Sequence, residues 1–349
     1  MTAATSERGR RILVVGPAWV GDMVMAQSLF MYLRQAAPVA RLDVLAPAWS
    51  VPLLERMPEV SEAIVAPLRH GRLGLMTRWR LGRELAQRNY HQAILLPNSW
   101  KSALVPFWAG IPLRTGYLGE QRWGLINDVR RLDRDALVMT VQRFVALARP
   151  ADAPPPTSSA LPRPALRVDP VAGRKSLSAL DLHPGPAPAM AICPGAEYGP
   201  AKRWPAEYFA EVALDRLQQG WQVWLLGSRD DATATALVSR YCQGRAVDLA
   251  GRTNLDQVVD LLAHCRAVVS NDSGLMHVAA ALGRPVAAIY GSSDPRTTPP
   301  LSERARVLRL DLPCSPCFQR RCPLGHLDCL RRLSPAQVIA AITELDAAA

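Results

Sequence analysis

The chain has 349 residues, 49% of them hydrophobic and 20% charged, which is enough apolar material for two ordinary domains. Its first residues, MTAATSERGRR, lack the apolar core of a signal peptide, and the longest apolar stretch, 274–291, is interrupted by His277, Arg284 and Pro285. The composition therefore excludes a membrane-spanning protein, and we expect a folded cytoplasmic one.

The formal net charge is +11, and only three of the 41 basic residues, Lys101, Lys175 and Lys202, are lysines. Such a basic chain is attracted to anionic partners, whether nucleic acid, phospholipid headgroups or a phosphorylated glycolipid. Charge alone does not choose among these partners.

Short apolar runs separated by helical patterns make up the first part of the chain. RILVVG at 11–16 ends at a Gly-Pro pair and precedes a helical pattern at about 22–35. RLDVLA at 41–46 and QAILLP at 92–97 are further strand candidates. Buried runs spaced by helices predict a parallel α/β sheet.

A proline-rich stretch divides the chain. Ten of the thirty prolines lie from Pro150 to Pro188, a density that resists regular structure. We therefore predict a first domain over 1–150, a linker over 151–188 and a second domain over 189–349.

The α/β pattern restarts after this linker. The expected strands lie at 190–195, 221–227, 266–271 and 285–291, and the expected helices at about 206–219, from about 231, and near 274–282. Two α/β halves of similar size predict a cleft between them, because ligands of open α/β folds bind at the carboxyl ends of the strands.

The loop after the first expected strand reads GPAWVGD, residues 16–22, and has the GxxxxG spacing of a P-loop. Asp22 stands where a P-loop has its lysine and would repel a triphosphate, so we reject an NTPase site. G-x-G-x-x-G is also missing after this strand, which disfavours a dinucleotide-dependent dehydrogenase. Asp22 is then either a carboxylate at the mouth of the expected cleft or the N-cap of the following helix.

The stretch PGAEYGPAKRWP, residues 194–205, follows the first expected strand of the second half. Lys202 lies just before the Trp204-Pro205 pair that opens a helix. It is a candidate partner for a phosphoryl oxygen, and the alternative is a surface lysine in a loop.

Four polar or small residues, Asn271, Asp272, Ser273 and Gly274, separate two apolar runs at a strand-to-helix turn. The unpaired N–H groups of such a turn suit a phosphate. Helix capping is the alternative, but it accounts for only one polar residue. Because His277 follows one turn later, we favour a phosphate site.

Six arginines and His70 lie from Arg69 to Arg88, against one acidic residue, Glu84. A solvated helix face is the usual meaning of such a run. A site for an anionic acceptor is the alternative.

Asp133-Arg-Asp135 has the D-x-D spacing that holds a metal-bound sugar nucleotide. Arg130, Arg131 and Arg134 surround it, and these cations disfavour a metal ion. We therefore read this stretch as a helix start.

Four of the seven cysteines lie late in the chain, within CSPCFQRRCPLGHLDC: Cys314, Cys317, Cys322 and Cys329. Four soft ligands in one loop, with His326 nearby, can hold a structural zinc ion. Their spacing departs from the common pair of C-x2-C motifs, so reduced thiols are the expectation and zinc is the alternative.

Three longer stretches carry a family resemblance: RILVVGPAWVGDMVMAQSL near the start, CPGAEYGPAKRWP in the middle and SNDSGLMHVAAALGRPVAAIYGSSDPRTTPPLS near the end. In this order and spacing, they resemble the ADP-heptose:lipopolysaccharide heptosyltransferases, family nine of the glycosyltransferases. The resemblance covers nearly the whole chain. Within the family, it is closest to the enzymes that add the second heptose.

The resemblance implies a GT-B fold, in which two Rossmann-like domains face each other across a cleft. The N-terminal domain would bind the acceptor and the C-terminal domain ADP-heptose, with the last helix expected to pack back on the N-terminal domain. It also implies an inverting transfer that requires no cofactor, in lipopolysaccharide core biosynthesis of a Gram-negative cell.

By motif position, the resemblance makes Asp22 the general base and Lys202 a contact of the donor phosphates. Residues implied in donor binding are Asn254, near the adenine, and Asp272, Ser273, Gly274, Leu275 and His277. Arg229 stands where related enzymes can offer a carboxylate to the ribose, which leaves Asp230 as the candidate substitute.

The implied acceptor is the inner-core heptose of Kdo-lipid A, an anionic glycolipid at the inner face of the cytoplasmic membrane. We expect a monomer in peripheral contact with that membrane. Candidate acceptor-binding residues are Trp19, Arg69, Arg72, Arg78 and Arg80.

Three alternatives remain: a transferase for the first heptose, a GT-B transferase with another nucleotide sugar, and a zinc-containing nucleic-acid binder. Against the last, no RNP, KH or finger pattern appears, and aromatic residues make up only 6% of the chain.

Overall fold

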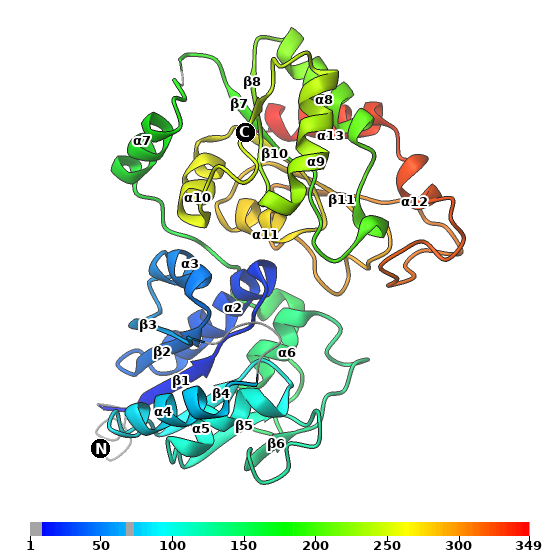
Figure 1. The fold of residues 1–349 in the computed structure, drawn as a ribbon. Coiled ribbons are helices and arrows are strands. Elements are labelled where there is room, and N and C mark those ends of the chain that lie inside the picture. Colours follow the sequence, from blue (N-terminus) through cyan, green and yellow to red (C-terminus); the bar gives the residue numbers. More distant parts are fainter. Residues whose placement is uncertain (1–8, 68–72, 184, 349) are drawn as a thin grey trace. The chain divides into compact units, whose positions relative to one another are not determined.

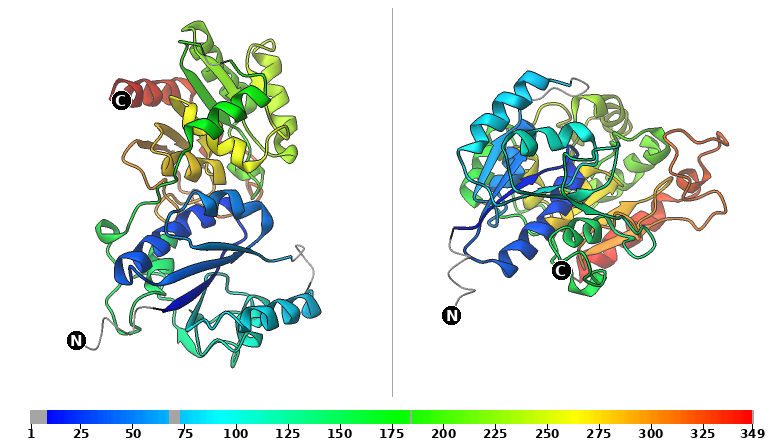
Figure 2. Two further views of the ribbon diagram at one scale, coloured as in Figure 1. Left: turned by 90° about the vertical axis from the view of Figure 1, so that its left-hand side faces the viewer. Right: turned by 90° about the horizontal axis from the view of Figure 1, so that it is seen from below.

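The computed structural model describes residues 9–67, 73–183 and 185–348. The chain forms two compact units, Met1–Pro164 and Ala165–Ala349. Each unit contains one six-stranded sheet in which every pair of neighbouring strands is parallel (Figure 1). Figure 2 shows helices flanking both sheets.

In the first unit, the strand order is β3-β2-β1-β4-β5-β6. The strands are β1 (Arg11–Val15), β2 (Arg41–Ala46), β3 (Glu62–Val65), β4 (Gln92–Leu95), β5 (Leu113–Tyr117) and β6 (Asp128–Arg130). The helices are α2 (Val20–Ala36), α3 (Val51–Glu55), α4 (Leu75–Ala86), α5 (Leu104–Trp108) and α6 (Thr140–Ala146), with short 3₁₀ turns η1 (Ala48–Ser50), η2 (Trp100–Ala103) and η3 (Ser158–Ala160).

Strand β1 lies at the centre of this sheet. Four of its five residues are buried, as expected for a parallel strand covered on both faces. Val14 pairs with Val44 of β2 on one side and with Ile94 of β4 on the other. The strand order therefore reverses between β1 and β4, which makes this place the topological switch point of the unit.

In the second unit, the order is β12-β11-β10-β7-β8-β9. The strands are β7 (Ala189–Cys193), β8 (Gln222–Leu225), β9 (Val247–Asp248), β10 (Ala267–Asn271), β11 (Val286–Ile289) and β12 (Ala305–Leu308). The helices are α7 (Pro170–Ala179), α8 (Ala206–Gln218), α9 (Ala232–Tyr241), α10 (Leu255–His264), α11 (Gly274–Ala281), α12 (Asp328–Arg331) and α13 (Pro335–Ala347), with 3₁₀ turns η4 (Pro200–Lys202) and η5 (Arg229–Asp231).

This second sheet has the same connectivity as the first. Its first strand, β7, pairs with β8 on one side and with β10 on the other, and Ile192 of β7 lies opposite Val269 of β10. Its switch point is therefore between β7 and β10. Helix α13 packs against α8 and against β10, β11 and β12 of the same unit.

The predicted fold class is confirmed, because both halves are α/β units with Rossmann-like parallel sheets. The expected helix at 206–219 is observed as Ala206–Gln218, and the one near 274–282 as Gly274–Ala281. Among the described helices, none combines the length and apolar character needed to cross a bilayer.

The segment predicted as a linker, 151–188, differs from the expectation. The boundary between the units falls at Pro164 and Ala165, and helix α7 lies within the second unit. The carboxylate of Asp169 accepts a hydrogen bond from the N–H of Val171 at 2.8 Å, and Pro170 occupies the first turn, where a helix needs no N–H. Proline at this place starts a helix and does not prevent one.

Candidate active site

The loops that follow β7 and β10 are joined at the switch point of the second unit. The side chain of Asn271, the last residue of β10, is fully buried. Its Oδ1 accepts from the N–H of Trp204 at 3.1 Å, and its Nδ2 donates to the carbonyl of Pro194 at 2.7 Å. Asn271 therefore fixes both ends of the loop that carries Lys202.

Lys202 and Asp272 form the central pair of this site. The Nζ of Lys202 lies 2.5 Å from Oδ2 of Asp272, and Ser293 Oγ donates to the same oxygen at 2.5 Å. The Asp272 side chain is only 5% exposed, whereas that of Lys202 is 17% exposed. The buried carboxylate thus anchors the ammonium group, which keeps some access to solvent.

Helix α11 begins beside this pair. Its N-cap, Ser273, has an extended backbone and makes no side-chain capping hydrogen bond. Ser273 Oγ instead lies 3.1 Å from Ser270 Oγ. In residues 270–281, all of which the structure describes, the capping interpretation is therefore not supported, and the first-turn N–H groups keep the positive end of the helix dipole.

His277 lies in the next turn of α11 and is buried. Burial lowers its pKa to about 4; the nearby Asp272 carboxylate acts in the opposite direction and the Lys202 cation in the same one. The imidazole is therefore neutral at physiological pH. The hydroxyl of the buried Tyr290 contacts the preceding residue of α11, Met276, at 3.4 Å from its sulfur, and donates to the carbonyl of Thr298 at 2.7 Å.

Leu275 and Asn254 were also predicted to bind the donor. Leu275 is half-buried in the first turn of α11, next to the Ser273 N-cap. Asn254 is the N-cap of α10: its Oδ1 accepts from the N–H of Gln257 at 2.8 Å, and Gln257 Oε1 accepts from the N–H of Asn254 at 3.0 Å. A reciprocal capping box thus already engages this side chain.

The loop after β8 contains a carboxylate that the sequence did not single out. Asp231 Oδ2 accepts hydrogen bonds from the N–H of Ser228 at 2.9 Å and from its hydroxyl at 2.8 Å. A Cβ at Gly195 would overlap the Asp231 carboxylate, so Asp231 lies against the loop after β7. The neighbours considered in the sequence, Arg229 and Asp230, are exposed.

Ser293 is a second residue that sequence reasoning did not select. It lies within the third stretch of the family resemblance, in SSDP, which was the available signal. Its contact with Asp272 spans 21 positions, so only the folded chain shows it.

In the first unit, Asp22 is the third residue of α2 and follows β1, the strand at the switch point. Trp19, the N-cap residue, makes no side-chain capping bond and is 46% exposed. Asp22 is half-buried and makes contacts of its own. A Cβ at Gly16 would lie 2.8 Å from the end of the Met23 side chain and 3.4 Å from the Leu45 carbonyl oxygen, so α2 packs closely against the end of this strand.

The predicted acceptor-binding arginines have different surroundings. Arg78 is 7% exposed; its Nε donates to the carbonyl of Leu73 at 2.8 Å and its Nη1 to that of Lys101 at 3.0 Å. These contacts give Arg78 a role in holding α4 on the unit. Arg80 is exposed on the same helix, and Arg69 and Arg72 lie outside the described residues.

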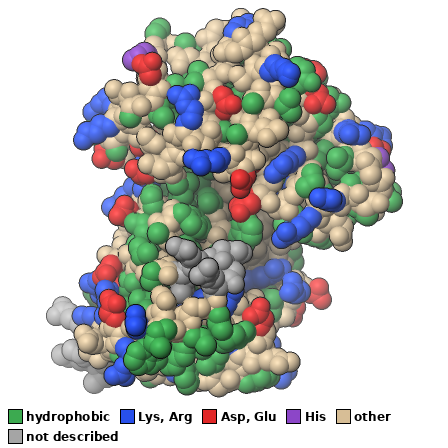
Figure 3. Space-filling view, in the orientation of Figure 1, with side chains coloured by type: hydrophobic (Ala, Val, Ile, Leu, Met, Phe, Trp, Pro, Cys, Tyr) green, Lys and Arg blue, Asp and Glu red, His purple; other side chains and the backbone are tan. Residues whose placement is uncertain are grey.

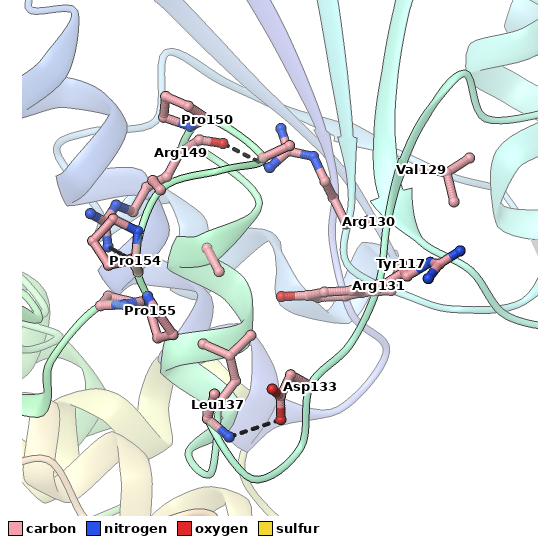
Figure 4. A pocket seen from close by; sticks show the side chains of 15 residues that line it. Tyr117, Val129, Arg130, Arg131, Asp133, Leu137, Arg149, Pro150, Pro154 and Pro155 are labelled. Carbon is pink, nitrogen blue, oxygen red and sulfur yellow. Dashed lines mark hydrogen bonds between the residues drawn. The ribbon is translucent and has the colours of Figure 1, made fainter.

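The predicted helix start at Asp133 is instead a turn. Its Oδ1 accepts from the N–H groups of Asp135 and Ala136, each at 3.0 Å. This side chain faces a pocket of about 410 Å³ in the first unit (Figure 4). Arg130, Arg131 and Arg149 also line the pocket, so an anionic group in it would meet arginine side chains.

The four late cysteines are reduced. The pKa of Cys329 is raised to about 11, first by burial and then by the other three thiols. In the part of the chain that the structure describes, no group of three or more His, Cys, Asp or Glu side chains is arranged to hold a metal ion. Structural zinc stays a prediction.

Comparisons with known proteins show the family to which the chain belongs. The model of "glycosyltransferase family 9 (heptosyltransferase)" matches residues 78–328. The chain is 51% identical over 307 residues to lipopolysaccharide heptosyltransferase 2 of Escherichia coli, covering 86% of this chain and 88% of that relative. It is 46% identical over 308 residues to lipooligosaccharide heptosyltransferase 2 of Haemophilus influenzae, with the same coverage of 86% and 88%.

Two solved structures have similar folds. The structure of ADP-heptose lps heptosyltransferase II of E. coli has a TM-score of 0.86 and 44% identity, covering 97% of this chain and 99% of that one. A glycosyl transferase of family 9 from Veillonella parvula has a TM-score of 0.85 at 23% identity and covers 98% of each chain. The second likeness supports the fold alone.

Proposed function

Because the chain belongs to glycosyltransferase family 9, the heptosyltransferase family, we propose that it adds the second heptose of the lipopolysaccharide inner core. The donor is ADP-L-glycero-β-D-manno-heptose, and the acceptor is the inner-core heptose of Kdo-lipid A. The observation that carries this proposal is the Lys202–Asp272 pair beside the start of α11, since a cation and the N-terminus of a helix together suit a diphosphate.

The second unit binds the donor in this proposal. Transfer breaks the bond between the anomeric carbon and ADP, and the electron pair of that bond leaves with the diphosphate. Lys202 and the N-terminus of α11 stabilise the negative charge as it develops. Asp272 and Ser293 hold Lys202 in position, and this cationic arrangement replaces a metal ion.

The first unit supplies the base. An acceptor hydroxyl oxygen forms the new bond to the anomeric carbon, and its proton passes to the carboxylate of Asp22. A single displacement inverts the configuration at that carbon. The position of Asp22 after the central strand β1 supports this role, because ligands of such sheets gather at the switch point.

His277 has a different part in the proposal. A neutral imidazole adds no charge to the donor site, and its burial makes it a packing group of α11. We place Leu275 and Gly274 beside the diphosphate and Asn254 near the adenine.

For the acceptor, we propose Trp19 and Arg80 as contacts, with Arg69 and Arg72 from outside the described residues. Arg78 acts through α4, because its Nε and Nη1 donate to backbone carbonyls. The acidic groups of Kdo-lipid A are the partners that arginine side chains favour.

We further propose that α4 brings the first unit to an anionic membrane surface. Its solvent face carries large apolar side chains next to arginines: Leu75 is 47%, Met76 60% and Trp79 45% exposed, and Arg80 and Arg83 lie on the same face. Figure 3 shows hydrophobic side chains gathered low on this unit, where Figure 1 draws α4 and α5. Tryptophan at the headgroup level and arginine against anionic lipid favour such contact.

Sedimentation with phosphatidylglycerol vesicles tests the membrane proposal. Trp79→Ala combined with Met76→Ala should lower the bound fraction by about threefold or more, because the apolar area that enters the interface is lost. Val39→Ala, at another exposed apolar position, is the control. Equal binding of the unmodified protein, the double variant and Val39→Ala would exclude α4 as the membrane contact.

The transfer reaction is tested with ADP-heptose and two lipid acceptors, which carry zero or one heptose. We expect transfer only to the acceptor that already has one heptose. Transfer to the heptose-free acceptor would instead make the protein a first-heptose transferase.

Calorimetry with ADP and UDP tests which nucleotide the donor carries. We expect tighter binding of ADP, and tighter binding of UDP would indicate a different donor.

A further inference from the structure

One segment of the second unit has no role in the proposed reaction. Residues 309–327, which we name the clasp segment, connect β12 to α12 without a helix or strand of their own. The segment contains Cys314, Cys317 and Cys322. Figure 3 shows basic side chains gathered over the part of the unit that Figure 1 draws in orange and red, which includes it.

The clasp segment is bonded to the turn that follows β11. The N–H of Phe318 donates to the carbonyl of Ser292 at 2.7 Å, and Ser315 Oγ donates to the carbonyl of Gly291 at 2.7 Å. Ser293, the next residue in this turn, donates to Asp272. The segment therefore supports the turn that holds the anchor of Lys202.

The clasp segment also holds the loop that carries Lys202. The hydroxyl of Tyr198 donates to the carbonyl of Phe318 at 2.7 Å, and the N–H of Ala201 donates to the carbonyl of Arg320 at 3.1 Å. Between them, Gly199 has a φ of 155°, and a Cβ there would lie 2.5 Å from the Arg320 oxygen. Only glycine allows the two backbones to approach this closely.

The ring of Tyr198 contacts the lysine itself. The Nζ of Lys202 lies 5.1 Å from the ring centroid, a distance at which a cation is attracted to the face of an aromatic ring. The guanidinium of Arg320 lies 5.3 Å from the same centroid. Tyr198 thus touches Lys202 with its ring and the clasp segment with its hydroxyl.

We propose that Tyr198 is a positioning residue for Lys202, and that the clasp segment acts on the donor diphosphate through it. This inference rests on the proposed function, because it requires that Lys202 binds the diphosphate. Lysine has a flexible four-carbon stem, so an ammonium group that is held in place loses less freedom when the donor binds. Asp272 fixes Lys202 from one direction, and the Tyr198 ring fixes it from another.

The test compares tyrosine variants in two backgrounds. Tyr198→Phe removes the hydroxyl bond to Phe318 and keeps the ring, whereas Tyr198→Leu removes both. The control is Tyr208→Phe, because the Tyr208 hydroxyl also donates to a backbone carbonyl of this unit, that of Arg331, at 3.2 Å. Each variant is made with Lys202 present and with Lys202→Ala.

With Lys202 present, we expect Tyr198→Phe to weaken ADP binding by about threefold, the size of one modest hydrogen bond, and Tyr198→Leu by about tenfold. Adenosine, which lacks phosphates, should bind all variants equally. In the Lys202→Ala background, both Tyr198 variants should change ADP binding by less than about twofold, because their partner is gone. The KM for the acceptor should stay unchanged throughout, and Tyr208→Phe should behave as the unmodified enzyme.

Two outcomes would overturn the inference. Equal losses from Tyr198→Leu with and without Lys202 would give Tyr198 an effect independent of the lysine. Equal weakening of adenosine and ADP would make that effect a general disturbance of the fold. Failure of the proposed function is recognised separately, because Lys202→Ala alone would then leave ADP binding unchanged.

Discussion

The two units share one strand order, but the residues that follow the first strand of each sheet carry opposite charges. In the first unit, helix α2 follows the central strand β1 and carries an acid, Asp22, in its first turn. In the second unit, the loop after β7 carries the cation Lys202, and α11 begins beside it after β10. A repeated backbone thus provides two equivalent edges, and the side chains placed on them decide what each edge binds.

The difference extends into the helices. Met23, fully buried, is the fourth residue of α2, and His277 is the fourth residue of α11. The apolar residue packs beneath a strand, whereas the imidazole lies beside a buried carboxylate and an ammonium group. The fourth helical position is therefore an apolar core position in α2, whereas in α11 it lies beside two charged groups.

The largest expected effect tests the acid of the first unit. Asp22→Asn should lower kcat by about 100-fold or more, because proton transfer from the acceptor loses its base. ADP affinity, measured by calorimetry, should survive. An equal loss of turnover and ADP binding would make Asp22 structural. It would contradict the proposal that the first unit supplies the base and the second binds the donor.

The second effect tests the cation of the second unit. Lys202→Ala should weaken ADP binding and slow transfer together, by roughly ten- to 50-fold, because one charged contact is lost in both the bound and the transition state. Steady-state kinetics at varied donor concentration measure both. Lys175→Ala, at the exposed lysine of α7, serves as the control. Unchanged affinity and rate would remove Lys202 from the site.

The third effect concerns the pH dependence of stability. It is tested by giving α11 a methionine at its fourth position, where α2 has Met23. The pKa of His277 is lowered to about 4 by burial, below its usual value near 6.5, so the unfolded chain binds more protons between these values. Stability should therefore fall as pH drops from 6.5 to 4. The loss of unfolding free energy between pH 6.5 and pH 4 should be smaller by roughly 1–2 kcal/mol in His277→Met than in the unmodified protein. Urea unfolding at a series of pH values measures this difference.

A matched change at His183 is the control for this measurement. Its side chain is 82% exposed, so His183→Met makes the same replacement at the surface and leaves the buried His277 in place. A slope that persists in His277→Met would assign the pH dependence to other groups.

The smallest effect concerns the hydrogen bonds of Asp272, the partner of Lys202. Ser293→Ala removes one of two hydrogen-bonding partners of Asp272 Oδ2 and should raise the donor KM by about threefold. Ser302→Ala, which alters a hydroxyl that accepts from the N–H of Arg304, is the comparison. A KM unchanged by Ser293→Ala would restrict the anchor of Lys202 to Asp272.

Local pattern was sufficient to predict much of this molecule. Buried runs such as 41–46 gave the strands, and their alternation with helices gave the parallel sheets. Lys202 and Asp272 were selected separately from their loops, and the structure places them in contact. The strand and helix predictions succeeded because strand ends and helix starts are set by short-range sequence, whereas the binding role of Lys202 and Asp272 stays a prediction.

Contacts between distant segments were not predictable in this way. The proline-rich segment was read as irregular, yet Asp169 and Pro170 start a helix. Arg78 was chosen for its charge, but folding buries it against two carbonyls. The hydrogen bond from Tyr198 to Phe318 joins residues 120 positions apart, and no local pattern contains such a pairing.

The bridge made by Asn271 has a consequence for redesign. Its amide ties Pro194 to Trp204 from a strand about 70 residues later, so the conformation of residues 194–204 depends on Asn271. A chimaera that exchanges only residues 194–204 with those of a transferase of other donor preference would receive the new loop sequence without the strand end that holds the loop in its conformation. Grafts should move this loop together with the end of β10, and success with the loop alone would mean that its shape is encoded within itself.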